Sequence, residues 1–182
     1  MRLSGSGFES SQAFSLVELL VVIAIVAILG GMAVAALSAK KGAEVSQAGG
    51  MASDLSKLAR QHALAKNTRT VLVVAQVNDG DIQRSAISIW DGSTNQLEKW
   101  NLLPESIVAT NAGVASTITI PTTFRGRPVI KADFYVFHPD GHMSQDPTKT
   151  PRLEIKPREG NQDNTYTVVF NAFTGLSRIE RP

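Results

Sequence analysis

The chain of 182 residues contains no cysteine. Disulfides, thiol nucleophiles and cysteine-ligated metal centres are therefore excluded. Histidine is also scarce, with only three residues. The sequence shows no Gly-x-Ser-x-Gly elbow, no His-Glu-x-x-His pair and no phosphate-binding glycine loop. We therefore do not expect an enzyme.

Charge is in short supply as well. Asp, Glu, Lys and Arg make up 19% of the chain, and the formal net charge is +2. A net positive charge this small does not predict nucleic-acid binding unless the basic residues cluster on one surface. Hydrophobic residues make up 43%, which is typical of a folded chain rather than a disordered one. The length suits one domain with an appendage.

The longest run that is poor in charge spans residues 14–37, where Glu18 is the single charged side chain. A helix of about 20 apolar residues can cross the hydrocarbon core of a membrane. The apolar core of a secretory signal is shorter, roughly 7–15 residues. An ionised carboxylate costs about 3 kcal/mol in hydrocarbon. Glu18 is therefore expected to have a partner or to lie at the water interface.

The helical pattern continues beyond this run. Apolar or small residues recur at three- and four-residue steps, which predicts one apolar face; they are Val45, Ala48, Met51, Ala52, Leu55, Leu58, Ala59 and Ala65. Each residue of the pairs Gly30-Gly31 and Gly49-Gly50 costs about 1 kcal/mol relative to Ala in a helix. We therefore predict one long helix over residues 14–66, bent at these pairs, whose second half packs on a domain.

Strand patterns take over after residue 67. β-branched and alternating runs are separated by turns rich in Gly, Pro, Asn and Asp. The predicted strands are residues 70–77, 85–90, 96–103, 115–120, 128–137, 152–156, 165–170 and 176–180. Strands do not alternate with helices, which argues against a parallel α/β fold. The predicted fold class is α+β, with a long bent N-terminal helix packed on an antiparallel β-sheet domain.

The stretch "FSLVELLVVIAIVAIL", beginning at Phe14, closely resembles the N-terminal signature of type IV pilins and type II secretion pseudopilins. In that family a short leader precedes a cleavage site. Phe is the first mature residue, Glu is the fifth, and a long apolar run follows. Counted from Phe14, Glu18 is the fifth residue. The chain from Phe137 onward also looks like the C-terminal half of H-type minor pseudopilins.

The resemblance implies that a prepilin peptidase cuts between Ala13 and Phe14 and methylates the new amine of Phe14. The family usually has Gly before the cut, whereas this chain has Ala13. The implied partners are this peptidase, other pilin or pseudopilin subunits and the inner membrane. The implied segments are a leader (1–13), a transmembrane and filament-core helix (14–37), an amphipathic continuation (38–66) and a periplasmic β-rich domain (67–182).

The resemblance also implies that Glu18 serves filament assembly, and the physical chemistry agrees. A carboxylate near a helix N-terminus gains up to about 1 kcal/mol from the macrodipole. In a filament, the amine of one subunit can pair with Glu18 of a neighbour; a buried charge left unpaired costs about 3–5 kcal/mol. We therefore predict a minor structural subunit of a type II secretion pseudopilus or a type IV pilus. After assembly, the subunit is expected in a periplasmic or cell-surface filament.

Two other functions remain open at this point. One is a minor pilin that binds DNA or a secreted substrate at a filament tip. Some minor pilins bind DNA through a C-terminal Gly-Arg-x-Arg pattern. Here Gly175-Leu176-Ser177-Arg178 lacks the first Arg, so Arg178 and Arg181 are weak candidates and we do not expect nucleic acid as a partner. The other is a signal-anchored periplasmic protein that does not polymerise.

Metal binding is a weak alternative as well. The segment "HPDGH" places His138, Asp140 and His142 close together, and imidazoles with a carboxylate can bind a transition metal. A Pro-Asp-Gly turn is, however, a common hairpin turn. Aspartates in the turns could hold calcium, but no regular calcium-loop spacing is present. We therefore expect no cofactor; the turn aspartates are Asp79, Asp81, Asp91, Asp140 and Asp146.

Overall fold

The computed structural model describes residues 15–92, 95–112, 122–143, 150–159 and 164–181. Within the helix, the side chains of residues 32–41 are outside this description. The chain divides into two compact units, Met1–Ala39 and Lys40–Pro182. The predicted strand at residues 115–120 lies outside the described residues.

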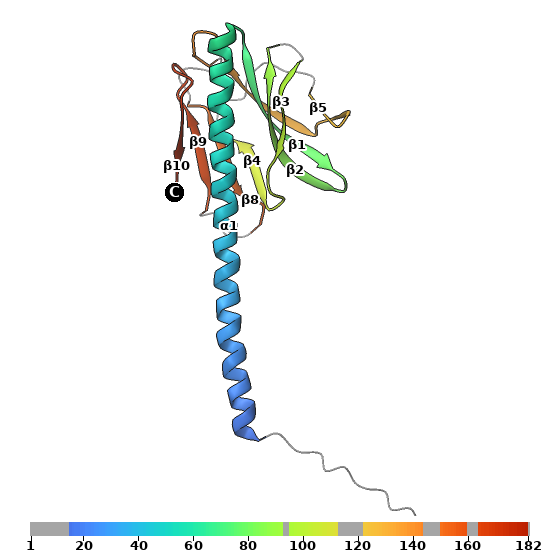
Figure 1. Ribbon diagram of the computed structural model, residues 1–182, viewed down its shortest axis with the longest axis vertical. Helices are drawn as coiled ribbons and strands as arrows, with labels where there is room; N and C mark the ends of the chain where they lie inside the picture. Colours follow the sequence, from blue (N-terminus) through green and yellow to red (C-terminus); the bar gives the residue numbers. More distant parts are fainter. Residues whose placement is uncertain (1–14, 93–94, 113–121, 144–149, 160–163, 182) are drawn as a thin grey trace, which may run out of the picture. The chain divides into compact units, whose positions relative to one another are not determined.

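Helix α1 runs from Leu16 to Lys66 (Figure 1). It ends where the sequence predicts, because Asn67 adopts a left-handed conformation with φ of 51°. The Thr68 N–H then donates to the Ala63 carbonyl at 3.2 Å, which closes the last turn as a Schellman-type cap. Helical hydrogen bonding is unbroken at both glycine pairs, and the bend expected there stays a prediction.

The strands form two antiparallel four-stranded sheets and a small hairpin, so the predicted α+β class is confirmed. The first sheet has the order β3 (Gln96–Leu102), β2 (Ile82–Asp91), β1 (Thr70–Asp79) and β7 (Lys131–Phe137). The second has the order β10 (Ser177–Glu180), β9 (Tyr166–Phe170), β8 (Arg152–Pro157) and β4 (Ile107–Asn111). The hairpin pairs β5 (Thr123–Phe124) with β6 (Arg127–Pro128).

One predicted strand is wrong in its extent. The run 128–137 is divided, because β6 ends at Pro128 and β7 begins only at Lys131. Proline has no N–H to donate to a ladder, which confines it to strand ends and edges. Strand β4 was not predicted.

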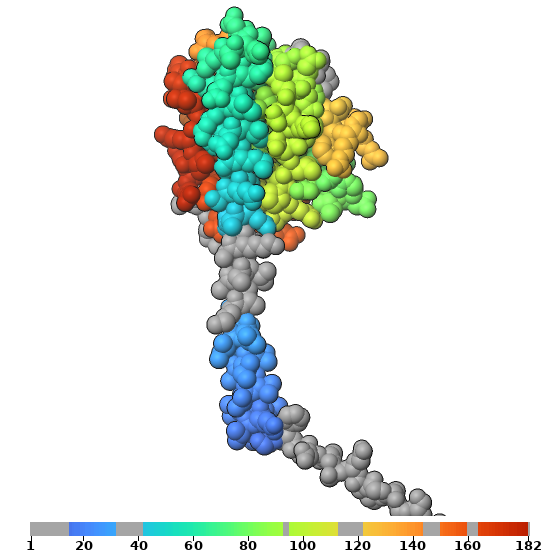
Figure 2. Space-filling model, viewed as in Figure 1, coloured from blue at the N-terminus to red at the C-terminus, as the bar shows by residue number. Residues whose placement is uncertain are grey.

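The main core lies between α1 and both sheets. In Figure 2 the helix from residue 42 onward (cyan to teal) lies between β9–β10 (red) and β3 (yellow-green). Small residues on this face, including Ala48, Ala52, Ala59 and Ala63, are fully buried and pack with large side chains of both sheets. A Cβ added to Gly49 would lie 3.1 Å from the Tyr166 ring, so the helix backbone closely approaches β9.

The buried face of α1 differs in part from the predicted one. Leu58 is 44% exposed, and Ala65 is exposed as well. Ser56 and Ala63 are buried instead. The Ser56 hydroxyl is satisfied, because it donates to the Ser53 carbonyl at 2.6 Å and lies 2.9 Å from the hydroxyl oxygen of Ser177. Packing against the two sheets, together with hydropathy, therefore determines which residues of α1 are buried.

A second cluster covers the opposite face of the first sheet. Alternate residues of β1, such as Val71 and Val73, are fully buried there with Trp90 and Val136. Both faces of β1 are therefore buried, which explains its almost continuous apolar sequence.

Candidate functional site

The N-terminal start of α1 is the first candidate site. Ser15 precedes the helix, and its side-chain oxygen accepts a hydrogen bond from the Glu18 N–H at 3.3 Å. The Ser15 carbonyl accepts from the Leu19 N–H at 3.1 Å. A Ser at the N-cap with Glu three residues later is the pattern of a capping box. Glu18 therefore lies in the first helical turn, where the macrodipole favours its charge.

The sequence reasoning missed the role of Ser15. The spacing Ser15-x-x-Glu18, followed by an apolar run, is itself a readable signal for a helix start. The predicted processing residues Ala13 and Phe14 lie outside the described residues.

The segment after Ser15 presents an apolar surface on every side. The side chains of residues 15–31 are all exposed within the single chain, and Leu16 is 78% exposed. A helix that is apolar all round is typical of burial among other apolar groups. The exposed large side chains are Leu16, Val17, Leu19, Leu20, Val21, Val22, Ile23, Ile25, Val26, Ile28 and Leu29.

Among the described residues, however, no helix combines the length and apolarity needed for a membrane span. The predicted transmembrane segment at residues 14–37 is therefore not confirmed.

The histidine turn forms the hairpin turn that its sequence indicates. The rings of His138 and His142 are stacked, with centroids 4.3 Å apart and planes within 5°. The Asp140 carboxylate accepts a bond from the His142 N–H at 3.2 Å and also contacts His142 Nδ1. Within the described ranges, no three His, Cys, Asp or Glu side chains are placed to hold a metal ion.

The surroundings of His138 disfavour its protonation. Partial burial lowers the pKa of His138 from its ordinary value of 6.5, and the nearby His142 and Arg69 act in the same direction. Asp140 opposes them by a smaller amount. The stacked pair is therefore best suited to a neutral His138.

The candidate arginines of the C-terminus contact their own chain. Arg178 forms an ion pair with Glu180 at 2.6 Å. The Arg181 guanidinium lies over the Tyr166 ring, 5.1 Å from its centroid, in a cation–π geometry. Each cation thus already has an intramolecular contact.

Turn aspartates have contacts too. Asp79 forms ion pairs with Arg84 at 3.2 Å and with Arg125 at 2.6 Å. Asp91 accepts bonds from the backbone and side-chain amides of Asn95. These carboxylates serve to fix turns, while Asp146 lies outside the described residues.

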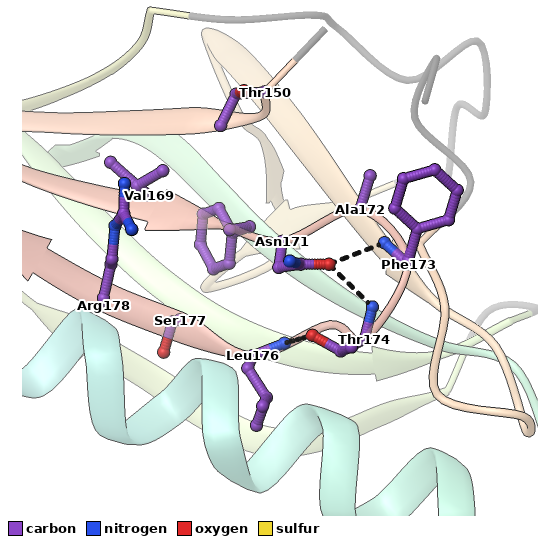
Figure 3. Close-up of a pocket in the computed structure, with 10 residues that line it drawn as sticks. Thr150, Val169, Asn171, Ala172, Phe173, Thr174, Leu176, Ser177 and Arg178 are labelled. Carbon is purple, nitrogen blue, oxygen red and sulfur yellow. Dashed lines mark hydrogen bonds between the residues drawn. The ribbon is translucent and has the colours of Figure 1, made fainter. Parts of the chain in front are cut away.

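A hollow of about 380 Å³ lies beside the β9–β10 turn, lined in part by Thr150, Val169 and Arg178 (Figure 3). Asn171 shapes this turn, because its Oδ1 accepts from the backbone N–H groups of Phe173 and Thr174, both at 3.0 Å. Phe173 is 72% exposed.

Comparison with known families finds a match in the N-terminal part of the chain. Residues 10–34 match the model described as the prokaryotic N-terminal methylation motif, which is the signature of type IV pilins and pseudopilins. The predicted resemblance is thereby confirmed, and the motif marks a type IV pilin-like precursor. Prepilin peptidase recognises this motif, and proteins that carry it assemble with other pilins. The chain matches no curated protein and no solved structure.

Proposed function

We propose that this chain is a minor structural subunit, not an enzyme, that assembles into a type II secretion pseudopilus or a type IV pilus. The observation that carries the proposal is the start of α1. A methylation motif coincides there with a Ser15-capped helix, a carboxylate in the first turn, and exposed apolar side chains behind it.

Processing between Ala13 and Phe14 would bring a new amine close to this carboxylate. Ser15 would become the second residue of the mature chain, so the helix would begin almost at the amine. One of the four free N–H groups at the helix start is already satisfied by Ser15. Glu18 then offers its charge to the amine of Phe14 in its own chain or in a neighbouring subunit.

The apolar side chains of residues 16–29 support a membrane origin and a filament destination. Burying one large aliphatic side chain gains about 1.5–3 kcal/mol, and the described part of this segment exposes many of them. Lipid can cover them before assembly, and the helices of other subunits can cover them afterwards. The unit Lys40–Pro182 would then lie in the periplasm.

The arrangement of the C-terminal half supports an H-type minor subunit. Strand β7 ends at Phe137, and His138 separates it from the Pro-Asp-Gly turn. Strands β8 and β9 follow, and a turn containing Gly175 leads into β10. The resemblance to H-type minor pseudopilins implies this order, in which a strand that ends at Phe-x-Pro-x-Gly is followed by two closing strands and a glycine-containing turn near the C-terminus.

Mass spectrometry of the N-terminus, on protein isolated from its native host, tests the processing step. We expect a chain that begins at N-methylated Phe14. An intact Met1, or a cut at another bond, would contradict the proposal and favour a signal-anchored protein.

Paired variants test the role of Glu18. Glu18→Gln removes the charge and should abolish recovery of the subunit in sheared filaments, while the chain stays in the membrane fraction. Ser15→Ala removes only the cap, at about 1 kcal/mol, and should assemble far better than Glu18→Gln. Assembly of Glu18→Gln at the wild-type level would show that the carboxylate has no part in it.

A further inference from the structure

Strand β10 is an open sheet edge. It is the outermost strand of the second sheet, and the structure places no other described strand beyond it (Figure 1). Its residues, Ser177–Glu180, include no Lys or Pro, and its pairing with β9 has no bulge. Lys, Pro and bulges are among the devices that keep an edge from pairing with another chain. β10 is instead short and charged, through Arg178 and Glu180, so its pairing requires a partner with complementary charges. By contrast, the edge strand β3 carries register shifts against β2.

The register shows which backbone groups of β10 face outward. The Asn171 N–H donates to the Leu176 carbonyl at 2.9 Å, and Arg178 lies opposite Val169. Since hydrogen-bonded and non-hydrogen-bonded pairs alternate in an antiparallel ladder, Arg178 and Glu180 bond to β9. The N–H and C=O groups of Ser177 and Ile179 therefore point toward the open edge.

The charges of β10 complement a second copy of the same strand. A twofold antiparallel pair places one residue directly opposite its own copy. Centring it on Arg178 or on Glu180 would place like charges opposite each other. Centring it on Ile179 places Arg178 opposite Glu180 of the other copy, twice by symmetry. Both side chains are accessible, at 74% and 42% exposure, and they share a face of the strand. Centring it on Ser177 would instead place Arg178 opposite Leu176.

We propose that β10 pairs with β10 of a second copy of this chain, antiparallel, with Ile179 opposite Ile179. The pairing joins two four-stranded sheets across a twofold axis. It uses only the sheet edge and does not depend on the assembly role of α1. A four-residue edge buries less than the roughly 1,200 Å² of a standard interface. The contact is therefore weak in dilute solution.

The absence of cysteine makes a direct test simple, because a single introduced thiol can form only an intermolecular disulfide. The Cα atoms of a hydrogen-bonded antiparallel pair lie about 5.5 Å apart, within the roughly 4.4–6.8 Å range of disulfides. The full chain carrying Ile179→Cys, in detergent under mild oxidation, should give a covalent dimer on a non-reducing gel. The more exposed Phe173→Cys is the control and should not, because the proposed register holds its two copies far apart.

Charge exchange tests the register. In the Ile179→Cys chain, Arg178→Glu should lower the rate of cross-linking at least about fivefold, since like charges then face each other twice. Adding Glu180→Arg should restore the rate, because the complementarity returns with the signs exchanged. Arg127→Glu on β6 changes the net charge equally and should leave the rate unchanged.

Three results would each overturn the proposal. They are the lack of a dimer from Ile179→Cys, equal cross-linking through Phe173→Cys, and a rate that ignores Arg178→Glu or is not restored by the double exchange.

Discussion

The turn between β9 and β10 allows a quantitative test of the packing, through Gly175→Ala. Gly175 has a φ of 63°. A Cβ at this position would lie 2.5 Å from the Gly141 carbonyl oxygen and 3.2 Å from Phe137 Cδ1. The oxygen belongs to the backbone of the histidine turn, so no side chain can rotate away to relieve the contact. One of the two turns must move.

The expected cost has two parts. A left-handed conformation costs a residue with a Cβ about 1–2 kcal/mol, and overpacking a tight site costs about 1–3 kcal/mol. Together they lower the free energy of unfolding by about 2–5 kcal/mol. At roughly 2–4 °C per kcal/mol for a chain of this size, Tm should fall by about 4–20 °C.

Gly80→Ala is the matched control. Gly80 has a φ of 70°, but a Cβ there would have nothing within 4 Å. Only the conformational cost of about 1–2 kcal/mol applies, so the expected loss of Tm is about 2–8 °C. Both variants are compared with the wild type by circular dichroism during heating, in the same detergent. If Gly175→Ala is no more destabilising than Gly80→Ala, the contact between the two turns does not constrain the fold as argued.

Three further predictions concern the core and the histidine turn. Phe170 is fully buried against Tyr135 and Phe137, so Phe170→Ala should lower the free energy of unfolding by about 3–5 kcal/mol. Phe173 is exposed, and Phe173→Ala should change the free energy of unfolding by less than about 0.5 kcal/mol. Equal effects of the two variants in thermal unfolding would contradict the assigned core. Tyr135→Phe removes the bond from the buried phenol to the Arg152 carbonyl, 2.9 Å long, and should cost about 1 kcal/mol in the same assay; an unchanged Tm would show that this bond is not needed. The pKa of His138 is lowered on folding, so the unfolded chain binds the proton more readily. The free energy of unfolding should therefore be level above about pH 7 and fall as the pH drops through about 6.5. His138→Gln should reduce the change in Tm between about pH 7 and pH 5, and an identical pH dependence in the variant would contradict this account.

Local patterns predicted the elements better than their arrangement. The apolar periodicity predicted the correct end of α1 at Lys66. β-branched and alternating runs predicted most of β1, β2 and β9. Hydropathy alone did not predict every buried residue of α1, because α1 packs on two sheets at once. Small residues such as Ala63 and Ala65 are equivalent to any hydropathy pattern, yet only Ala63 contacts the core.

The candidate sites show the same limit. Glu18 was found because its spacing from Phe14 is encoded in the sequence, and the motif is confirmed. The stacking of His138 on His142 depends on side-chain orientation, which residue spacing cannot distinguish from a ligand pair. Likewise, the ion pair of Arg178 with Glu180 follows only once β10 is known to be a strand, since extended residues two apart share a face.

The position of Glu18 explains how a carboxylate can be tolerated in an apolar segment. In the first turn it gains up to about 1 kcal/mol from the macrodipole, beside a helix start that Ser15 already caps. One or two turns later neither contribution would remain. A carboxylate at the centre of a membrane helix costs about 3 kcal/mol, so in the first turn the cost that remains after the local gain is below about 2 kcal/mol. In the proposed filament, the amine of a processed Phe14 supplies the missing partner, so the residual cost in the isolated subunit becomes a driving force for assembly.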